Sequence, residues 1–168
     1  MEASRDSAGG ARATVYARLR KHPFVEPFDD AHVRRLAELA RDVRFERDQV
    51  VFHEGDECNE FYLIASGLIA LEVEEPGHTL RVQTLSEGDE LGWSSLLMAS
   101  GKQFQARALE PVEALAFDAT QLLAECRKDP AFGFDFAYRL LGVVAGRLHF
   151  TRMQLHDMYS PVAKRAGT

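Results

Sequence analysis

Residues 85–107 read LSEGDELGWSSLLMASGKQFQAR. This stretch predicts a strand end, a Gly-Asp turn, a helix of about seven residues, a loop and a new strand. The first turn of such a short helix presents unpaired backbone N–H groups and the positive end of a dipole. Gly92 lets the backbone come close to a bound group. We therefore expect an anion site at this turn, with phosphate as the usual occupant.

Short runs rich in Val, Ile, Leu, Phe and Tyr extend on both sides of this stretch, from Val43 to Asp118. Ser66–Gly67 and Pro76–Gly77 between them are turn signals. Glycines recur between the runs at intervals of 10 to 12 residues, at Gly55, Gly67, Gly77 and Gly88. Short strands at this spacing predict an all-β sandwich or barrel.

Helical patterns flank the strands. We expect N-terminal helices within residues 14–41, strands within 42–117 and C-terminal helices within 118–159. Asp29 or Asp30 can cap the second N-terminal helix, and Asp118 can cap the first C-terminal one. Residues 14–159 then form a single domain between a disordered arm, residues 1–13, and a tail, residues 160–168.

The last predicted helix opens at Asp129–Pro130 and carries two apolar stripes. The stripe Phe132, Phe136 and Leu140 is expected to pack on the strands. The second stripe is spaced 3, 4, 3, 4, 3 and consists of Leu141, Val144, Leu148, Thr151, Leu155 and Met158. This a/d pattern predicts a homodimer seam. The alternative is one helix that lies along its own core.

Composition excludes several classes of protein. The net charge of −6 argues against a general nucleic-acid binder, which needs clustered Lys and Arg. No run of about 18 apolar residues is present, and the first 13 residues lack the apolar middle of a signal peptide. Cys58 and Cys126 form neither a disulfide framework nor a metal motif. We expect a cytoplasmic protein with no membrane partner and no cofactor.

Catalytic and metal motifs are also missing from the sequence. No GxSxG, HExxH or GxxxxGK[ST] pattern occurs. The six histidines include no closely spaced pair on a predicted strand, so they do not form a metal site. We therefore expect no catalytic residue, no bound metal and no enzymatic activity.

Three segments together resemble the cyclic nucleotide-binding domain, and above all the regulatory half of the catabolite activator protein superfamily. They are FHEGDECNEFYLIASGLIALE (52–72), similar to the first roll motif, LSEGDELGWSSLL (85–97), similar to the phosphate-binding cassette, and GRLHFT (146–151), similar to the part of the family's dimer helix that reaches the purine. The resemblance covers about residues 23–159. It implies a mainly β fold: a double-stranded β-helix, or jelly-roll-like β-roll, with N-terminal helices and a long C-terminal helix.

The cassette departs from the family at both side-chain anchors. In the family, a Glu after the glycine binds the ribose hydroxyl, and an Arg followed by Ser or Thr pairs with the cyclic phosphate. Here those positions hold Trp93, and Gln103 followed by Phe104. Loss of the Arg alone removes a charge-assisted contact of roughly 1.5–3 kcal/mol. The expected ligand-binding residues are therefore Leu91, Gly92, Trp93, Ser94, Ser95, Lys102, Gln103, Phe104 and Thr151.

Three of these positions leave alternatives open. Trp93 and Phe104 can stack on a planar ligand or fill the cavity and exclude it. Thr151 can meet a base edge or bond back to its own helix. Lys102 and Arg107 can supply charge, although Arg107 can instead lie on a solvent-facing side of its strand.

The sequence supports two functions. The first is a sensor that binds a cyclic nucleotide or related nucleotide in the β-roll and signals through the long helix to an unknown protein partner. The second is a ligand-free, dimeric interaction module, with Trp93, Phe104 and Met98 plugging the pocket. The last nine residues, SPVAKRAGT, cannot form a helix-turn-helix domain, so we expect no direct DNA binding unless the chain is a fragment.

Overall fold

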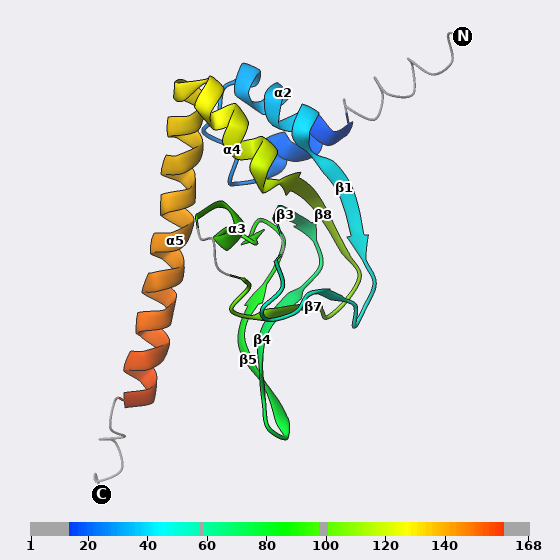
Figure 1. The fold of residues 1–168 in the computed structure, drawn as a ribbon, viewed down its shortest axis with the longest axis vertical. Helices are drawn as coiled ribbons and strands as arrows, with labels where there is room; N and C mark the ends of the chain where they lie inside the picture. Colours follow the sequence, from blue (N-terminus) through cyan, green and yellow to red (C-terminus); the bar gives the residue numbers. More distant parts are fainter. Residues whose placement is uncertain (1–13, 58, 98–100, 160–168) are drawn as a thin grey trace, which may run out of the picture.

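Eight strands and a set of flanking helices make up the part of the chain that the computed structural model describes, residues 14–57, 59–97 and 101–159 (Figure 1). The expected arm (1–13) and tail (160–168), Met98 and the side chain of Met158 lie outside the described part. The helices gather at one end of the roll, and the long α5 runs down one side of it.

The strands form two antiparallel four-stranded sheets, which confirms the mainly β fold. One sheet has the order β1-β8-β3-β6 and the other β2-β7-β4-β5. Their bounds are β1 Arg41–Phe45, β2 Val50–Phe52, β3 Glu60–Ser66, β4 Ile69–Glu75, β5 His78–Leu85, β6 Glu90–Leu91, β7 Gln105–Ala108 and β8 Val112–Asp118.

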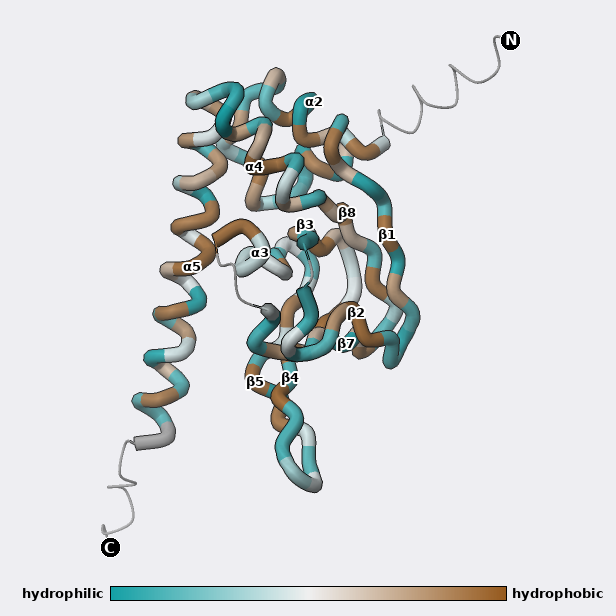
Figure 2. The backbone as a smooth tube through the Cα atoms, viewed as in Figure 1, coloured by the Kyte–Doolittle hydropathy of each residue, from teal (hydrophilic) through white to brown (hydrophobic). Residues whose placement is uncertain are grey.

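Strand β3 shows why a continuous apolar run suits the middle of this fold. Successive side chains of a strand point to opposite faces. Phe61 and Leu63 enter a core shared with the helices. Tyr62 and Ile64 enter a second core between the two sheets. Both faces of the strand are thus buried. The tip of the β4–β5 hairpin, in contrast, is hydrophilic (Figure 2).

Side-chain caps set the starts of the helices. The Asp29 carboxylate accepts from the N–H of His32 at the start of α2 (Asp30–Leu39), so Asp29 is the capping residue. Asp118 likewise caps α4 (Ala119–Lys128) by accepting from Gln121 N–H. Residues 14–21 form a helix before α2. These caps satisfy amides that a helix leaves unpaired at its start.

The last helix, α5 (Pro130–Tyr159), has a buried beginning and an exposed remainder. Phe132, Phe136 and Leu140 are buried in the core next to the helices, as the first stripe predicts. Phe136 makes an edge contact with Phe24 at 5.4 Å between ring centroids. Farther along α5, Leu141, Leu148 and Leu155 are 63%, 51% and 47% exposed.

Candidate ligand-binding site

A cavity of about 270 Å³ lies between the β-roll and α5. The roll contributes mainly apolar walls, and α5 contributes polar and aromatic ones. Its lining consists of Phe52, Leu71, Val82, Gln83, Leu85, Glu90, Leu91, Gly92, Trp93, Ser94, Lys102, Gln103, Phe104, Arg147, Phe150, Thr151 and Gln154. Ligand pockets of small molecules begin at about 300 Å³, so the space suits a compact ligand.

The structure brings together around this cavity eight of the nine predicted ligand-binding residues. These eight are Leu91, Gly92, Trp93, Ser94, Lys102, Gln103, Phe104 and Thr151. Ser95, the ninth, is not among the lining residues, and its hydroxyl oxygen accepts a hydrogen bond from the Lys102 ammonium. That these residues bind a ligand stays a prediction.

At Gly92 we expected the backbone to come close to a bound group, and the structure places it close to strand β3 instead. Gly92 has a φ of +83°, and a Cβ there would lie 2.4 Å from the Glu60 carbonyl oxygen. The glycine therefore lets the cassette approach strand β3, and the close neighbour is the protein's own backbone. The Ser95 hydroxyl strengthens this contact by donating to the same Glu60 oxygen at 3.1 Å.

The predicted helix in the cassette begins at Ser94. Within the described residues α3 spans Ser94–Leu97, and residues 98–100, over which the predicted helix of about seven residues would continue, lie outside them. The prediction of unpaired amides through Ser95 is wrong, because the Ser95 N–H donates to the Gly92 carbonyl at 3.0 Å. The N–H of Leu96 similarly donates to the Trp93 carbonyl at 3.1 Å. The amides of Ser95 and Leu96 are thus used within the turn itself.

Lys102 is the cation of the cassette wall. It is 5% exposed, although lysine is almost never buried to that degree without a partner. Its Nζ donates to Ser95 Oγ at 2.5 Å and to Ser94 Oγ at 3.5 Å. The same ammonium lies 4.9 Å from the centroid of the Phe52 ring. These contacts hold the charge at the edge of the cavity, beside the Phe52 ring.

Trp93 and Phe104 line the cavity without filling it. Both side chains are half-buried, and Trp93 also packs against the core next to the helices. Of the alternative plug, Trp93 and Phe104 leave space beside both rings, and Met98, its third member, lies outside the described residues. Both rings offer flat apolar surface to the cavity.

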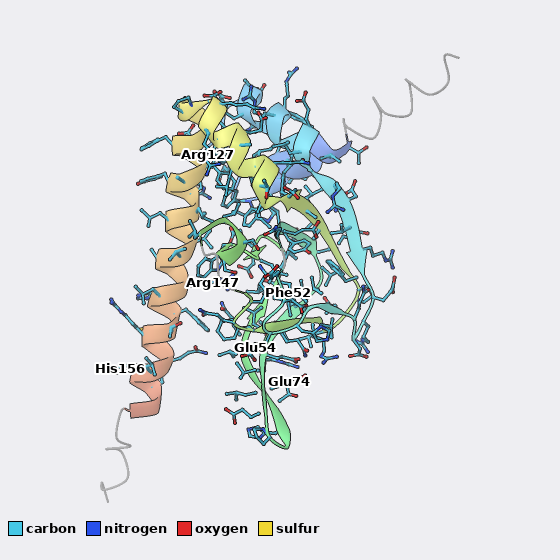
Figure 3. The ribbon with its side chains drawn as sticks, in the orientation of Figure 1. Phe52, Glu54, Glu74, Arg127, Arg147 and His156 are labelled. Atoms are coloured by element: carbon cyan, nitrogen blue, oxygen red, sulfur yellow. The ribbon has the colours of Figure 1, made fainter. Side chains whose placement is uncertain are left out.

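Helix α5 closes the other side of the cavity. Arg147 donates from Nη2 to the Glu90 carbonyl at 3.1 Å, and Figure 3 shows it on α5 with Phe52 across on the roll. Gln154 donates to the Val82 carbonyl at 3.5 Å. The Thr151 hydroxyl bonds back to the Arg147 carbonyl at 3.0 Å, the second of its two predicted roles, and Thr151 also lines the cavity, so a contact with a base edge stays a prediction. Three side chains of α5 thus touch the roll or brace the helix beside the cavity.

Burial shifts the two charged groups at this contact in opposite directions. Desolvation lowers the pKa of the Arg147 guanidinium, and the nearby Asp89 and Glu90 carboxylates partly offset that effect. Desolvation also raises the pKa of the Glu90 carboxyl, while the Arg147 charge lowers it. The two groups therefore stabilise each other's charge at the junction of α5 and the cassette.

Arg107 lies away from the cavity. Its Nε donates to the buried Glu72 carboxylate at 3.1 Å, and its Nη1 donates to the Asp48 carbonyl at 3.2 Å. Arg107 thus neutralises a carboxylate within the β4–β7 sheet and supplies no charge to the site. Gln103 lines the cavity with an exposed side chain.

Sequence reasoning missed Arg147, Glu90 and Phe52. Arg147 had a usable signal, because it precedes Thr151 by four residues and so lies on the same face of the helix. Glu90 and Phe52 had none, since their inward direction depends on how the two sheets meet. No group of three or more His, Cys, Asp or Glu side chains suited to a metal occurs within the described residues. No helix there has the length and apolarity that a membrane crossing requires.

Comparisons with known proteins agree with this architecture. The sequence profile of the cyclic nucleotide-binding domain matches residues 42–129. The chain belongs to the cyclic nucleotide-binding domain family. The match includes every lining residue of the cavity that the roll contributes, from Phe52 to Phe104.

Individual relatives from this family are distant. The global nitrogen regulator of Nostoc sp. is 27% identical over 117 residues, which are 68% of this chain. The matched part is 51% of that relative, so this chain spans about half of its length. A cyclic nucleotide-binding domain from Methylobacillus flagellatus superposes with a TM-score of 0.73 at 19% identity, covering 94% of this chain and 85% of that one. The Thermus thermophilus catabolite activator protein gives 0.68 at 25% identity, covering 81% and 62%. The names of these three relatives are those of a regulator, a binding domain and an activator protein.

Proposed function

We propose that this member of the cyclic nucleotide-binding domain family is a cytoplasmic sensor. A small nucleotide-like ligand enters the cavity, and its presence shifts α5, which a partner protein reads. The observation that carries the proposal is the two-sided wall of the cavity, with Trp93, Lys102 and Phe104 from the roll and Arg147 and Thr151 from α5. The names of the relatives, which include two regulators, support the same direction.

The contacts of α5 explain how occupancy would be transmitted. Beyond Leu140 no described residue of the helix is buried, so its position depends on a few contacts such as Arg147 to Glu90 and Gln154 to Val82. A ligand that touches both walls adds contacts in one helix position and not in another. Such differential affinity is what shifts a two-state equilibrium.

We also propose a homodimer through α5. Leu141, Leu148 and Leu155 are spaced seven residues apart and are exposed over about half of their surface or more. Exposed apolar side chains in a heptad line favour pairing of helices. Val144 is half-buried and Thr151 faces the cavity, so the leucines carry the proposed seam.

The exposed leucines also favour a second candidate, a dimeric interaction module that needs no ligand. The two candidates differ in a thermal melt with cyclic mononucleotides and cyclic dinucleotides. At a concentration of 100 times Kd, a ligand stabilises the fold by about 2.7 kcal/mol. For a domain of this size that raises Tm by roughly 5–11 °C. If no nucleotide changes Tm at millimolar concentration, the nucleotide sensor is excluded and the interaction module is the candidate that remains.

Matched variants make the test specific for the cavity. Thr151→Trp adds an indole on the cavity side of α5 and should abolish the shift in Tm. Thr120→Trp adds the same group at an exposed position of α4 and should leave the shift unchanged. Equal shifts in both variants would place the binding site elsewhere.

A further inference from the structure

We infer that a second hollow, between α5 and the turn that precedes β6, binds an apolar α-amino acid through Arg147 and Glu90. The guanidinium of Arg147 holds the carboxylate of the amino acid, and the carboxylate of Glu90 holds its ammonium. This site is separate from the cavity of the proposed function and requires no ligand there. The shape of the hollow, the charges of its wall and the pairing of those charges point to this ligand.

The hollow has room for a small molecule. Its volume is about 460 Å³, and small-molecule pockets span about 300–1,000 Å³. Gly142 and Gly146 line it from α5. A Cβ at either glycine would meet nothing within 4 Å apart from the backbone of its own helix. A ligand can therefore lie directly against this face of α5.

The charges of the wall favour a ligand that carries both signs. Two guanidinium groups, Arg139 and Arg147, and two carboxylates, Asp89 and Glu90, line the hollow. These four charges sum to zero, so a ligand with a net charge is attracted to one pair and repelled by the other. A zwitterion with one positive and one negative group can be attracted to both pairs at once.

The Glu90 carboxylate is the acceptor that this wall leaves open. Asp89, the other carboxylate, already accepts from the Ser86 N–H at 2.8 Å. Among the described residues, no other residue donates a hydrogen bond to the Glu90 carboxylate or forms an ion pair with it. Burial raises the pKa of the Glu90 carboxyl, and the nearby Arg147 charge lowers it. An ammonium group supplies the donors that such a partly desolvated carboxylate needs.

Arg147 is the matching donor. Its Nη2 donates to the Glu90 carbonyl at 3.1 Å, and its guanidinium has no further hydrogen bond or ion pair among the described residues. Most of the N–H donors of the guanidinium are thus available to a carboxylate, which can accept two of them in parallel. Arg139 is more fully used, since it donates to the Phe24 and Pro23 carbonyls at 3.0 and 2.6 Å. Arg139 therefore adds positive charge to the wall, and Arg147 makes the contact.

The remaining wall favours an apolar side chain on the amino acid. Val143 is half-buried and Phe150 is 46% exposed, and both line the hollow. An aliphatic side chain would remove apolar surface of both residues from water. A charged side chain would instead add a net charge, which the neutral wall does not favour. The expected ligands are therefore amino acids such as leucine.

The test measures the binding of L-leucine by calorimetry, with two analogues that each lack one charge. L-Leucinamide has only the ammonium, and N-acetyl-L-leucine has only the carboxylate. We expect L-leucine to bind at least about tenfold more tightly than either analogue, because it alone contacts both Arg147 and Glu90 with a charged group. If either analogue binds as tightly as L-leucine, or if L-leucine does not bind at millimolar concentration, the inference is overturned.

Variants locate the site. Gly146→Leu fills the hollow with a residue that also favours helix, so it should abolish the binding of L-leucine. Ala137→Leu is the matched control, since it adds a leucine at an exposed position of α5 outside the hollow and should leave binding unchanged. Equal binding by these two variants overturns the inference.

Glu90→Gln tests the charge contact, because it keeps the shape of the side chain and removes its charge. This variant should bind L-leucine at least about tenfold more weakly and N-acetyl-L-leucine within about threefold of the wild type. An unchanged affinity for L-leucine counts against the inference. Should Glu90→Gln fail to fold, the comparison of Gly146→Leu with Ala137→Leu still decides.

Thr151→Trp separates this site from the proposed function. Thr151 lines the first cavity and does not line the hollow, so this variant should still bind L-leucine. Loss of L-leucine binding in folded Thr151→Trp would place the amino acid in the first cavity and overturn the inference. If nucleotides bind and L-leucine does not, the inference falls and the sensor stands. If L-leucine binds as expected and no nucleotide does, the sensor falls and this site stands.

Discussion

Replacing Gly92 with alanine tests the contact that sets the cassette against strand β3. Gly92 has a φ of +83°, a region that costs an L-residue roughly 1–2 kcal/mol. The new Cβ would also lie 2.4 Å from the Glu60 carbonyl oxygen, which is strand backbone and cannot turn aside. Overpacking of this kind adds about 1–3 kcal/mol. Alanine returns about 0.4–1 kcal/mol by restricting the unfolded chain. The net loss is about 2–4 kcal/mol.

Gly77→Ala is the matched control. Gly77 has a φ of +89° at the tip of the β4–β5 hairpin, with nothing within 4 Å of an added Cβ. Only the backbone strain remains there, so the loss should be about 1 kcal/mol. The assay is urea unfolding of both variants and the wild type, compared at equal m-value. If Gly92→Ala is no less stable than Gly77→Ala, the close approach to Glu60 is not the reason for the glycine.

Three further predictions concern the helices and a buried histidine. Leu148→Glu should convert the proposed dimer to a monomer in sedimentation equilibrium, because it places charge in the apolar line, and an unchanged mass would remove the seam. Asp129→Ala should destabilise the fold by about 1 kcal/mol in urea unfolding, because the Asp129 carboxylate accepts from the amides of Ala131 and Phe132 at the start of α5. An unchanged unfolding midpoint would show that Asp129 does not stabilise this helix start. Burial lowers the pKa of His22, so the unfolded chain binds more protons than the folded one, and the fold should lose stability as pH falls below about 6.5. In urea unfolding at several pH values, His22→Asn should lose less stability over this range. An equal loss in both proteins would refute the role of His22.

Much of the fold could be predicted from local patterns. Asp118 caps a helix because a short acceptor side chain at that point satisfies a free amide whatever packs nearby. Phe132, Phe136 and Leu140 are buried as their 3.6-residue period predicts. The family assignment rests on the same kind of local signal, spread over the roll motif and the cassette.

Only part of the cavity lining was predictable from the sequence, namely its cassette residues and Thr151. Residues 91–94 and Lys102 were predicted to line the site because they lie in the same stretch of sequence, residues 85–107, and they do line the cavity. The amide of Ser95 was misjudged, since its bond to the Gly92 carbonyl depends on how the chain turns where Gly92 contacts strand β3. Phe52, far from the cassette in sequence, reaches the cavity only because the two sheets face each other.

The sequence by itself determined the strand cadence, the caps and the apolar stripe of α5, because these depend on residues within a few positions of one another. Only the tertiary structure decided that Trp93 lines the cavity, that Arg107 neutralises Glu72 and that Lys102 is buried in the cavity wall. The physical reason is that side-chain direction and charge pairing depend on contacts between distant strands and helices. Those contacts form only when the two sheets and α5 close around one space.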